Sequence, residues 1–260
     1  MCMRVGLRCV VAAVGLMGTM QVSCGQAPPA AAPRLVLVEL FTSEGCSSCP
    51  PADALLRKIN GVQTHSGELV VGISEHVTYW NQLGWVDPFS DEAYTQRQND
   101  YAGHFGLDSS YTPQVVVNGE TQVLGSDGTA ILKAVTKDEG LSPVTLHIDS
   151  LDGGAAAKTM TVTFSLAGHP AHSVDVYAVI ADDKAISSVA RGENTGRTLE
   201  HVSVARSLAK VATVKEAKTM TVSLKVPAAI KGQPETGRHL ILFAQEGGVG
   251  KVVAVEMKGL

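Results

Sequence analysis

Two cysteines separated by two residues, Cys46 and Cys49 in the segment CSSC, are the part of the sequence best suited to chemistry. They follow a short apolar run at residues 35–41 and precede a segment with helical periodicity at residues 50–59. Cysteines at this spacing in the first turn of a helix lie within bonding distance, and the helix N-terminus stabilises a thiolate. The pattern predicts a Cys46–Cys49 disulfide in which the exposed Cys46 is the nucleophile and the more buried Cys49 resolves the mixed disulfide.

Around this pair, the sequence up to residue 137 alternates between strand and helix patterns. Short apolar runs indicate strands, runs with one apolar face at helical spacing indicate helices, and an Asn-Gly pair between two strands indicates a hairpin. The predicted elements are a strand at 35–41, a helix at 50–59, a strand at 68–75, a helix at 90–105, strands at 114–117 and 121–124, and a helix at 126–137. This βαβαββα order predicts a mixed sheet covered by helices.

After residue 142 the pattern changes to short strands separated by turns that contain Gly or Pro. The predicted strands are 144–150, 158–166, 173–181, 197–205, 218–226, 238–245 and 251–256, and residues 205–215 could instead form a short helix. Strands at this spacing are typical of an antiparallel sandwich. The predicted fold class is therefore an α/β domain at residues 34–140, followed by an all-β sandwich-like domain at residues 142–260.

A proline stands directly before the third predicted strand, in the segment Tyr111-Thr112-Pro113. After a βαβα order, this is the place for a cis X–Pro turn that faces the cysteine pair. We therefore expect a cis bond before Pro113, with the Thr112 backbone facing an incoming substrate.

The element order, the CxxC pair and the proline together resemble the thioredoxin-like superfamily. More closely, the chain is similar to DUF1223, a family of exported bacterial proteins of uncharacterised function. The similarity lies in VELFTSEGCSSCPPAD at 38–53, HVTYWNQLGWVDPF at 76–89, YTPQVVVNG at 111–119 and GSD at 125–127. The chain departs from the family at Thr78, where Asp is common. The resemblance implies a thioredoxin-like fold and thiol–disulfide chemistry, but it implies no particular substrate.

Three acidic residues near the pair are candidates for moving protons. Glu39 lies in the strand before the motif, where thioredoxin-like proteins often use a buried acid as a general base; strand alternation could equally place it on a solvated edge. Glu44 is expected to be exposed, with a charge that opposes thiolate formation. Asp53 follows Cys49 by one helical turn, and it is either a proton relay or a solvated surface residue.

Four further side chains, those of His76, Tyr79, Trp80 and Trp85, follow the second predicted strand. Ligands bind at the carboxyl ends of strands in open α/β sheets. These residues could therefore form a peptide-binding wall beside Thr112, or they could cap the core of the small domain.

Two other functions would use the same residues. Cys46, Cys49 and His76 could bind Cu(I) or Zn(II), although exported copper chaperones typically have three residues between their cysteines. In the other alternative, the protein is a non-enzymatic binding module and CSSC is a structural disulfide. No P-loop, GxSxG or HExxH motif is present, and we expect no cofactor. The leading prediction is thiol–disulfide exchange with exported proteins and an unknown redox partner.

The N-terminus has the pattern of an export signal. Two arginines precede an apolar run at residues 9–20, which is too short for a transmembrane helix. We expect a signal peptide at residues 1–24, a Pro/Ala linker at residues 25–33, and a mature protein in the periplasm or secreted. The stretch ending at Cys24 resembles a bacterial lipobox except for Gln21, so a lipidated Cys24 that anchors the protein is an alternative.

Composition limits the remaining possibilities. The chain is 45% hydrophobic, and its formal net charge of −4 becomes −6 when Arg4 and Arg8 are removed with the signal. A negative charge argues against a dedicated nucleic-acid-binding protein. Of the five cysteines, three lie in the signal or at its edge. The folded protein therefore keeps only the CSSC pair.

Overall fold

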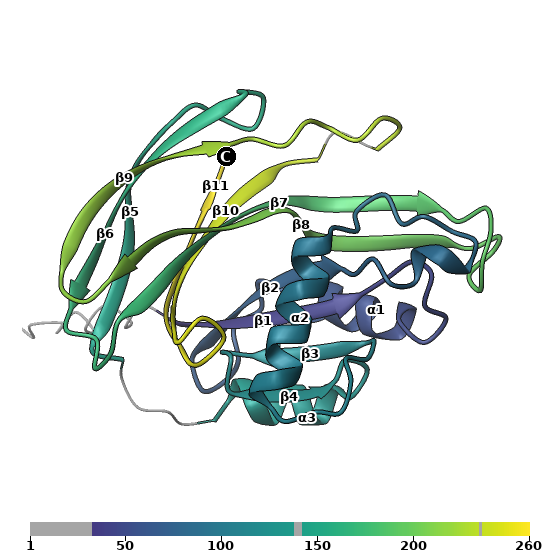
Figure 1. The fold of residues 1–260 in the computed structure, drawn as a ribbon, viewed down its shortest axis with the longest axis horizontal. Helices are drawn as coiled ribbons and strands as arrows, with labels where there is room; N and C mark the ends of the chain where they lie inside the picture. The colour runs from purple at the N-terminus through teal and green to yellow at the C-terminus, as the bar shows by residue number, and fades with distance from the viewer. Residues whose placement is uncertain (1–32, 138–141, 234–235) are drawn as a thin grey trace, which may run out of the picture. The chain divides into compact units, whose positions relative to one another are not determined.

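A computed structural model describes residues 33–137, 142–233 and 236–260 of the chain (Figure 1). These residues form eleven strands and three α-helices, so the described part of the protein is mostly β. The first elements are β1 Arg34–Thr42, α1 Pro50–Ile59, β2 Glu68–His76, the 3₁₀ turn η1 Asn81–Leu83, α2 Glu92–His104, β3 Gln114–Val117, β4 Thr121–Leu124 and α3 Gly128–Val135. The later strands are β5 Val144–Asp152, β6 Thr159–Gly168, β7 Val174–Ser188, β8 Thr198–Val214, β9 Lys218–Lys225, β10 Arg238–Glu246 and β11 Val252–Gly259. The predicted βαβαββα order and all seven later strands are confirmed.

Eight strands form one mixed sheet, in the order β11-β10-β7-β8-β2-β1-β3-β4. Within it, β1 is parallel to β2 and antiparallel to β3. On the other side of β2, the sheet continues into β8 through a parallel pairing of Ser74 with Val204. Strands from both halves of the chain therefore share one sheet. The predicted fold class, a thioredoxin-like domain followed by a separate sandwich-like domain, is wrong.

The lengths of β7 and β8 explain this difference. They have 15 and 17 residues, longer than the strands predicted at 173–181 and 197–205. The alternative of a helix at 205–215 is also wrong, because residues as far as Val214 pair with β7. The added length carries one end of β8 to β2 and α1, while its other end packs beneath a second, three-stranded sheet, β5-β6-β9.

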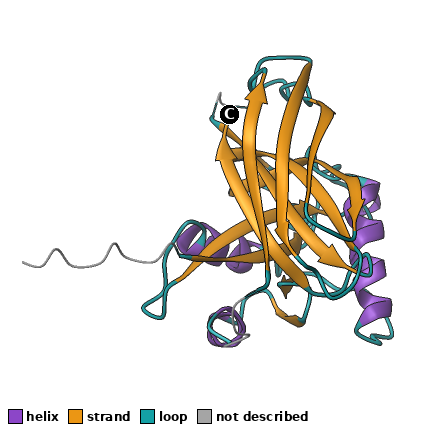
Figure 2. Ribbon diagram, turned by 90° about the vertical axis from the view of Figure 1, so that its left-hand side faces the viewer, coloured by secondary structure: helices purple, strands orange, loops and turns teal. Residues whose placement is uncertain are grey.

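The sheet around β1 is covered by helices on both faces (Figure 2). Alternation along the strand sends Val36, Val38 and Leu40 to the face covered by α1 and α3. The intervening residue Leu37 packs instead against Tyr94 of α2, on the opposite face. A side chain's position in β1 therefore determines whether it meets α1 or α2.

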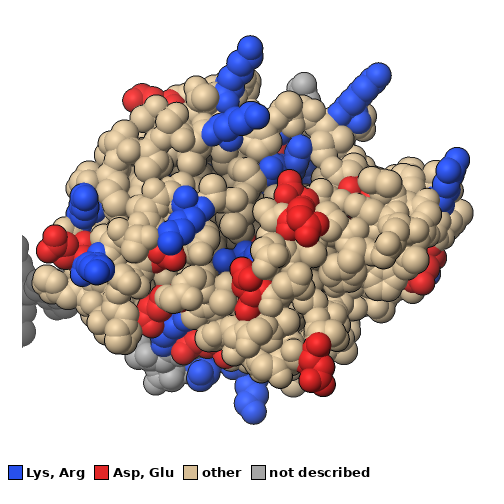
Figure 3. Space-filling model, viewed as in Figure 1, with Lys and Arg blue, Asp and Glu red and all other residues tan. Residues whose placement is uncertain are grey.

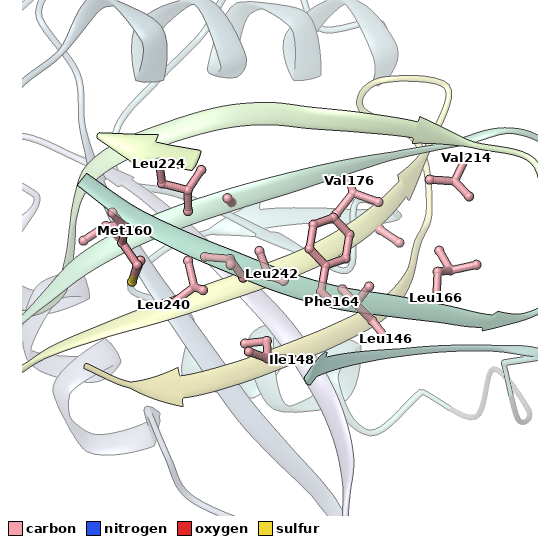
Figure 4. Packing of buried hydrophobic residues seen from close by; sticks show 14 of the residues in the cluster. Leu146, Ile148, Met160, Phe164, Leu166, Val176, Val214, Leu224, Leu240 and Leu242 are labelled. Carbon is pink, nitrogen blue, oxygen red and sulfur yellow. The ribbon is translucent and has the colours of Figure 1, made fainter. Parts of the chain in front are cut away.

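A second core fills the space between the three-stranded sheet and strands β7 and β10 (Figure 4). Phe164 of β6 and Leu242 of β10 are both fully buried there. Apolar and polar residues alternate in β6, which has one buried face, whereas β10 is a nearly continuous apolar run that is buried on both faces. This core holds the smaller sheet against the C-terminal half of the larger one.

The predicted Asn118-Gly119 hairpin is confirmed, and both residues have positive φ, 48° and 69°. This is the backbone of the hairpin turn that favours Asn-Gly. A Cβ on Gly119 would lie 2.0 Å from the carbonyl oxygen of Gly250. Only glycine therefore fits where this turn meets the loop between β10 and β11.

The predicted signal peptide, most of the linker and Cys24 lie outside the described residues. Among the residues that are described, no helix has the length and apolar character needed to cross a membrane. On the face drawn in Figure 3, basic and acidic side chains are interspersed, with no large area of one sign. That face shows no surface suited to a polyanion.

Candidate functional site

The CSSC segment forms the turn between β1 and α1. The predicted disulfide is confirmed: Cys46 and Cys49 are bonded, with their Cα atoms 5.4 Å apart. Cys49 is the residue directly before α1, and its carbonyl accepts the backbone N–H groups of Ala52 and Asp53. The pair therefore lies where the first N–H groups and the dipole of a helix favour negative charge.

Both cysteines are fully buried in this oxidised state, whereas Ser47 and Ser48 between them are exposed. The prediction that Cys46 is exposed is wrong for the disulfide form. The Ser48 hydroxyl lies 3.3 Å from Cys46 Sγ, so the sulfur is close to the surface without being on it.

The cover over Cys46 comes from the loop between β7 and β8, residues 189–197. The buried Asn194 side chain donates hydrogen bonds of 2.9 Å to the carbonyls of Glu44 and Cys46. The neighbouring Glu193 carboxylate accepts the Ser47 N–H at 3.1 Å. Nothing in the sequence of this polar loop indicates that it reaches a motif about 150 residues earlier.

Beneath the turn lies a buried charged cluster formed by Glu44, Asp53, His76, Asp87 and His201. His201 of β8 stands between two carboxylates, with Nε2 3.4 Å from Glu44 Oε1 and Nδ1 3.7 Å from Asp53 Oδ1. Its ring lies against His76, with centroids 4.7 Å apart. His76 Nδ1 is 2.7 Å from Asp87 Oδ2. The predictions that Glu44 is exposed and that Asp53 is a solvated surface residue are wrong, because both side chains have partners inside the protein.

Each carboxylate of the cluster also accepts a hydrogen bond from a neutral donor. The Thr42 hydroxyl donates to Asp53 at 2.9 Å, and Trp85 Nε1 donates to Glu44 at 2.7 Å. The Glu44 N–H donates to Asp87 at 2.8 Å. Trp85, predicted as part of a peptide-binding wall, thus donates its indole N–H to the buried Glu44 carboxylate.

The pKa values within the cluster show which groups are charged. Burial works to lower the pKa of His201, but the Asp53 and Glu44 carboxylates outweigh it and raise the value to about 10. Burial works to raise the pKa of Asp87, but the neighbouring His76 brings it below its usual value. Near neutral pH, His201 is therefore a cation and Asp87 an anion.

Trp80 links the residue before the CSSC segment to the proline turn at Thr112 and Pro113. The Thr112–Pro113 bond is cis, as predicted. Trp80 Nε1 donates to the Thr112 hydroxyl at 2.8 Å, and a Cβ added to Gly45 would lie 2.9 Å from Trp80 Cβ. Trp80 therefore packs against both the CSSC turn and the proline turn.

Tyr79 contacts Trp80 and α2. Its ring centroid is 6.3 Å from that of Trp80, and its hydroxyl donates to Gln98 of α2. Thr78, the position where the similar family commonly has Asp, bonds to Glu92 and Thr95 near the start of α2. Both residues support the approach of α2 to the end of β2.

Glu39 is not brought together with the cysteines. Its position in β1 points it to the α2 face, where it accepts hydrogen bonds from Arg97 at 2.5 Å and from the Tyr101 hydroxyl at 2.6 Å. Glu75 also lies there, 3.9 Å from Arg97, and its pKa is raised because of burial and the charge of Glu39. Arg97 further donates to Gln245 of β10 at 3.0 Å. This cluster stabilises the opposite side of the sheet.

His76, the third residue of the metal-site alternative, is engaged on both ring nitrogens. Besides Asp87, it contacts the Ser74 hydroxyl, 3.2 Å from Nε2. Among the residues that the structure describes, no group of three or more His, Cys, Asp or Glu side chains is arranged to hold a metal ion. The geometry therefore offers no support for the copper or zinc alternative.

Sequence reasoning missed His201, Asn194, Asp87 and Arg97. The only available signal for His201 was its spacing of two residues from Leu199, which places a polar residue on the buried face of an alternating strand. That pattern does not reveal which carboxylates the ring would meet.

Comparisons with known proteins agree with this architecture. The crystal structure of protein AGR_C_4864 from Agrobacterium tumefaciens is 26% identical, covers 88% of this chain and 95% of its own, and superposes with a TM-score of 0.63. HBP35 of Porphyromonas gingivalis also has a TM-score of 0.63, at 15% identity, over 88% of this chain and 76% of its own, and shows likeness of fold alone. No curated protein matches the chain significantly. The model of DUF1223, described as a protein of unknown function, matches residues 37–245, and the chain belongs to this family.

Proposed function

We propose that the protein carries out thiol–disulfide exchange, with Cys46 as the sulfur that is attacked and Cys49 as the resolving cysteine. The observation that carries this proposal is the bonded pair at the start of α1, placed directly over a buried cluster of ionisable side chains. A disulfide that only staples the fold has no need of such a cluster, because charges buried in a protein are costly.

The exchange balances with a dithiol substrate. A substrate thiolate attacks Cys46 Sγ, the Cys46–Cys49 bond breaks, and Cys49 leaves as a thiolate that takes up a proton. The second substrate thiolate then attacks the substrate sulfur of the mixed disulfide, and Cys46 leaves. Two electrons and two protons pass from the substrate to the protein, and the reverse sequence reduces a substrate disulfide.

Several neighbouring groups have places in this scheme. Trp80 and Thr112, held together beside the turn, form the surface that an unfolded substrate segment would meet first. Asp53 lies beneath the turn, next to His201, and we assign it rather than Glu39 to the proton balance. The assignment follows from the side of the sheet: Asp53 lies on the α1 face with the cysteines, whereas Glu39 lies on the opposite, α2 face.

We also propose that the protein is exported, which fits a persistent disulfide. The support is the charged and apolar pattern of the first residues. The mass of the mature protein tests it: loss of residues 1–23 with added acyl mass would establish lipidation of Cys24, loss of the signal without added mass would establish plain cleavage, and an intact N-terminus would contradict export.

One specific observation favours a second candidate, a structural disulfide in a binding module: both cysteines are fully buried, and Asn194 is bonded to the carbonyl of Cys46. The reduction potential separates the two functions. The protein is equilibrated in glutathione buffers, and the Cys46 and Cys49 thiols are trapped and quantified. A potential between about −120 and −270 mV is typical of exchange proteins, whereas a value below about −300 mV indicates a structural disulfide.

A trapping experiment tests the roles of the two cysteines. In Cys49→Ser, the Cys46 thiol should form a mixed disulfide with an oxidised model protein that persists, because no resolving thiol is present. The matched Cys46→Ser variant should form little or none. Equal trapping by both variants, or none by either, would contradict the assignment.

A further inference from the structure

His201 comes from the second half of the chain, yet it lies at the centre of the charges around the cysteine turn. It is 2% exposed, and neither of its ring nitrogens makes a hydrogen bond. Its polar contacts are instead the ionic approaches to Glu44 and Asp53, at 3.4 and 3.7 Å. A buried imidazole in this setting acts mainly through its charge.

The two carboxylates bracket the disulfide along the chain. Glu44 precedes Cys46 by two residues, and Asp53 lies one helical turn after Cys49 in α1. A carboxylate near a thiol disfavours its ionisation, because two negative charges repel. Without a compensating cation, these carboxylates would oppose the effect of the helix N-terminus on Cys46.

Other charged and titratable groups face His201 from the elements packed around it. His76 of β2 contacts the ring edge and is itself paired with Asp87. Outside the cluster, the Arg57 side chain of α1 donates to the backbone carbonyl of Glu200, and Glu193 bonds to the CSSC turn. Of these groups, only His201 lies between the carboxylates on both sides of the disulfide.

We propose that His201 is the positioning residue of the cysteine site: its imidazolium holds Glu44 and Asp53 in place and offsets their charge, so that Cys46 ionises near neutral pH. This inference rests on the proposed exchange function and adds that the second half of the chain supplies a group on which the reactivity of the thiol depends. The pKa of His201, raised to about 10, keeps the ring charged over the range in which thiols titrate.

The test is the pH dependence of alkylation at Cys46 in the reduced full-length chain, assigned by peptide mass. In His201→Gln, the midpoint for Cys46 should rise by about one unit, which slows alkylation by about tenfold at pH values well below both midpoints. His239→Gln is the matched control, because His239 is another buried histidine paired with a carboxylate, that of Asp183. Its midpoint for Cys46 should equal that of the unmodified chain.

A double variant distinguishes charge from a general loss of structure. Glu44→Gln combined with His201→Gln removes one anion together with the cation, so the midpoint should return toward the original value. Should His201→Gln fail to fold, Glu44→Gln alone still tests the idea, since loss of an anion should lower the midpoint. An unchanged or lowered midpoint in His201→Gln, or an unchanged midpoint in Glu44→Gln, would overturn the proposal.

The outcome can be separated from that of the proposed function. A potential below about −300 mV in the unmodified chain would reject the exchange function, whatever the alkylation midpoints are. A potential in the range of exchange proteins together with equal midpoints in His201→Gln and His239→Gln would reject the role of His201 alone.

Discussion

Removal of the Asn194 side chain should expose Cys46 and accelerate reduction of its disulfide. In the structure this amide donates to the carbonyls of Glu44 and Cys46, each at 2.9 Å, and Cys46 is fully buried. A thiolate must approach a disulfide sulfur along the S–S axis, so the loop has to move before a reductant can attack. The rate of reduction therefore depends on how often the loop opens.

The size of the effect follows from the two hydrogen bonds. Each contributes about 1 kcal/mol net, so Asn194→Ala should destabilise the closed loop by about 2 kcal/mol. Because 1.4 kcal/mol corresponds to a tenfold change, the open population should increase about thirtyfold. With dithiothreitol in excess, the observed rate of disulfide reduction should increase by the same factor.

The assay quenches reduction at intervals with a maleimide and quantifies modified Cys46 and Cys49. Thr195→Val is the matched control, because the Thr195 hydroxyl bonds only within the same loop, to the Gly192 carbonyl. Because this bond does not join the loop to the cysteine turn, that variant should stay within about twofold of the unmodified rate. An unchanged rate in Asn194→Ala would refute the idea that the loop controls access to Cys46.

Three further predictions concern stability, and each is measured by urea unfolding. The pKa of His201 is raised from 6.5 to about 10, so its contribution to the free energy of unfolding is complete below pH 6.5 and is lost as the pH rises toward 10. The loss amounts to roughly 5 kcal/mol. In His201→Gln the free energy of unfolding should therefore fall less steeply over this pH range. An equally steep decline in the variant would contradict the pairing. Gly45→Ala places a methyl carbon 2.9 Å from Trp80 Cβ, and the overpacking should cost about 1–3 kcal/mol; an unchanged midpoint would show that the turn moves freely. Arg97→Met leaves the Glu39 carboxylate without its buried cation and should cost about 3–5 kcal/mol, whereas a loss below about 1 kcal/mol would show that the pair is dispensable.

Local features of the fold were predictable because they depend on a few adjacent residues. The helix at Pro50–Ile59 begins where two prolines lose no helical hydrogen bond, and its bounds agree with the prediction. The hairpin at Asn118-Gly119 follows from the positive φ that both residues tolerate. The confirmed Cys46–Cys49 bond likewise follows from local spacing at a helix start.

Strand pairing was not predictable, because an apolar strand pattern specifies which face is buried and not which strand lies beside it. The alternating pattern of β8 is compatible with a strand in a sandwich and equally with a strand inserted next to β2. The choice depends on the combined fit of apolar faces from distant segments, such as Ile241 of β10 and Val71 of β2 in one cluster. The separate sandwich was predicted for this reason.

The same limit explains the errors at the candidate site. Charged residues such as Glu44 and Asp53 are most often exposed, and that is the correct expectation when no partner is known. They are buried here because His201, Thr42 and Trp85 pair with them, and two of these three partners lie far along the chain. The partner of a buried charge has to be found in three dimensions.

On both faces of β1 and β2, buried charged side chains have partners from the second half of the chain. On the α1 face, the carboxylates around the cysteines are paired with His201 of β8. On the α2 face, Arg97 completes its hydrogen bonds through Gln245 of β10. A buried charge that loses its partner costs several kcal/mol, so the CSSC half would lack counter-charges and donors if it stood alone. The strands after residue 142 are therefore a structural part of the cysteine site, because they supply partners to the buried charges on both faces of the sheet.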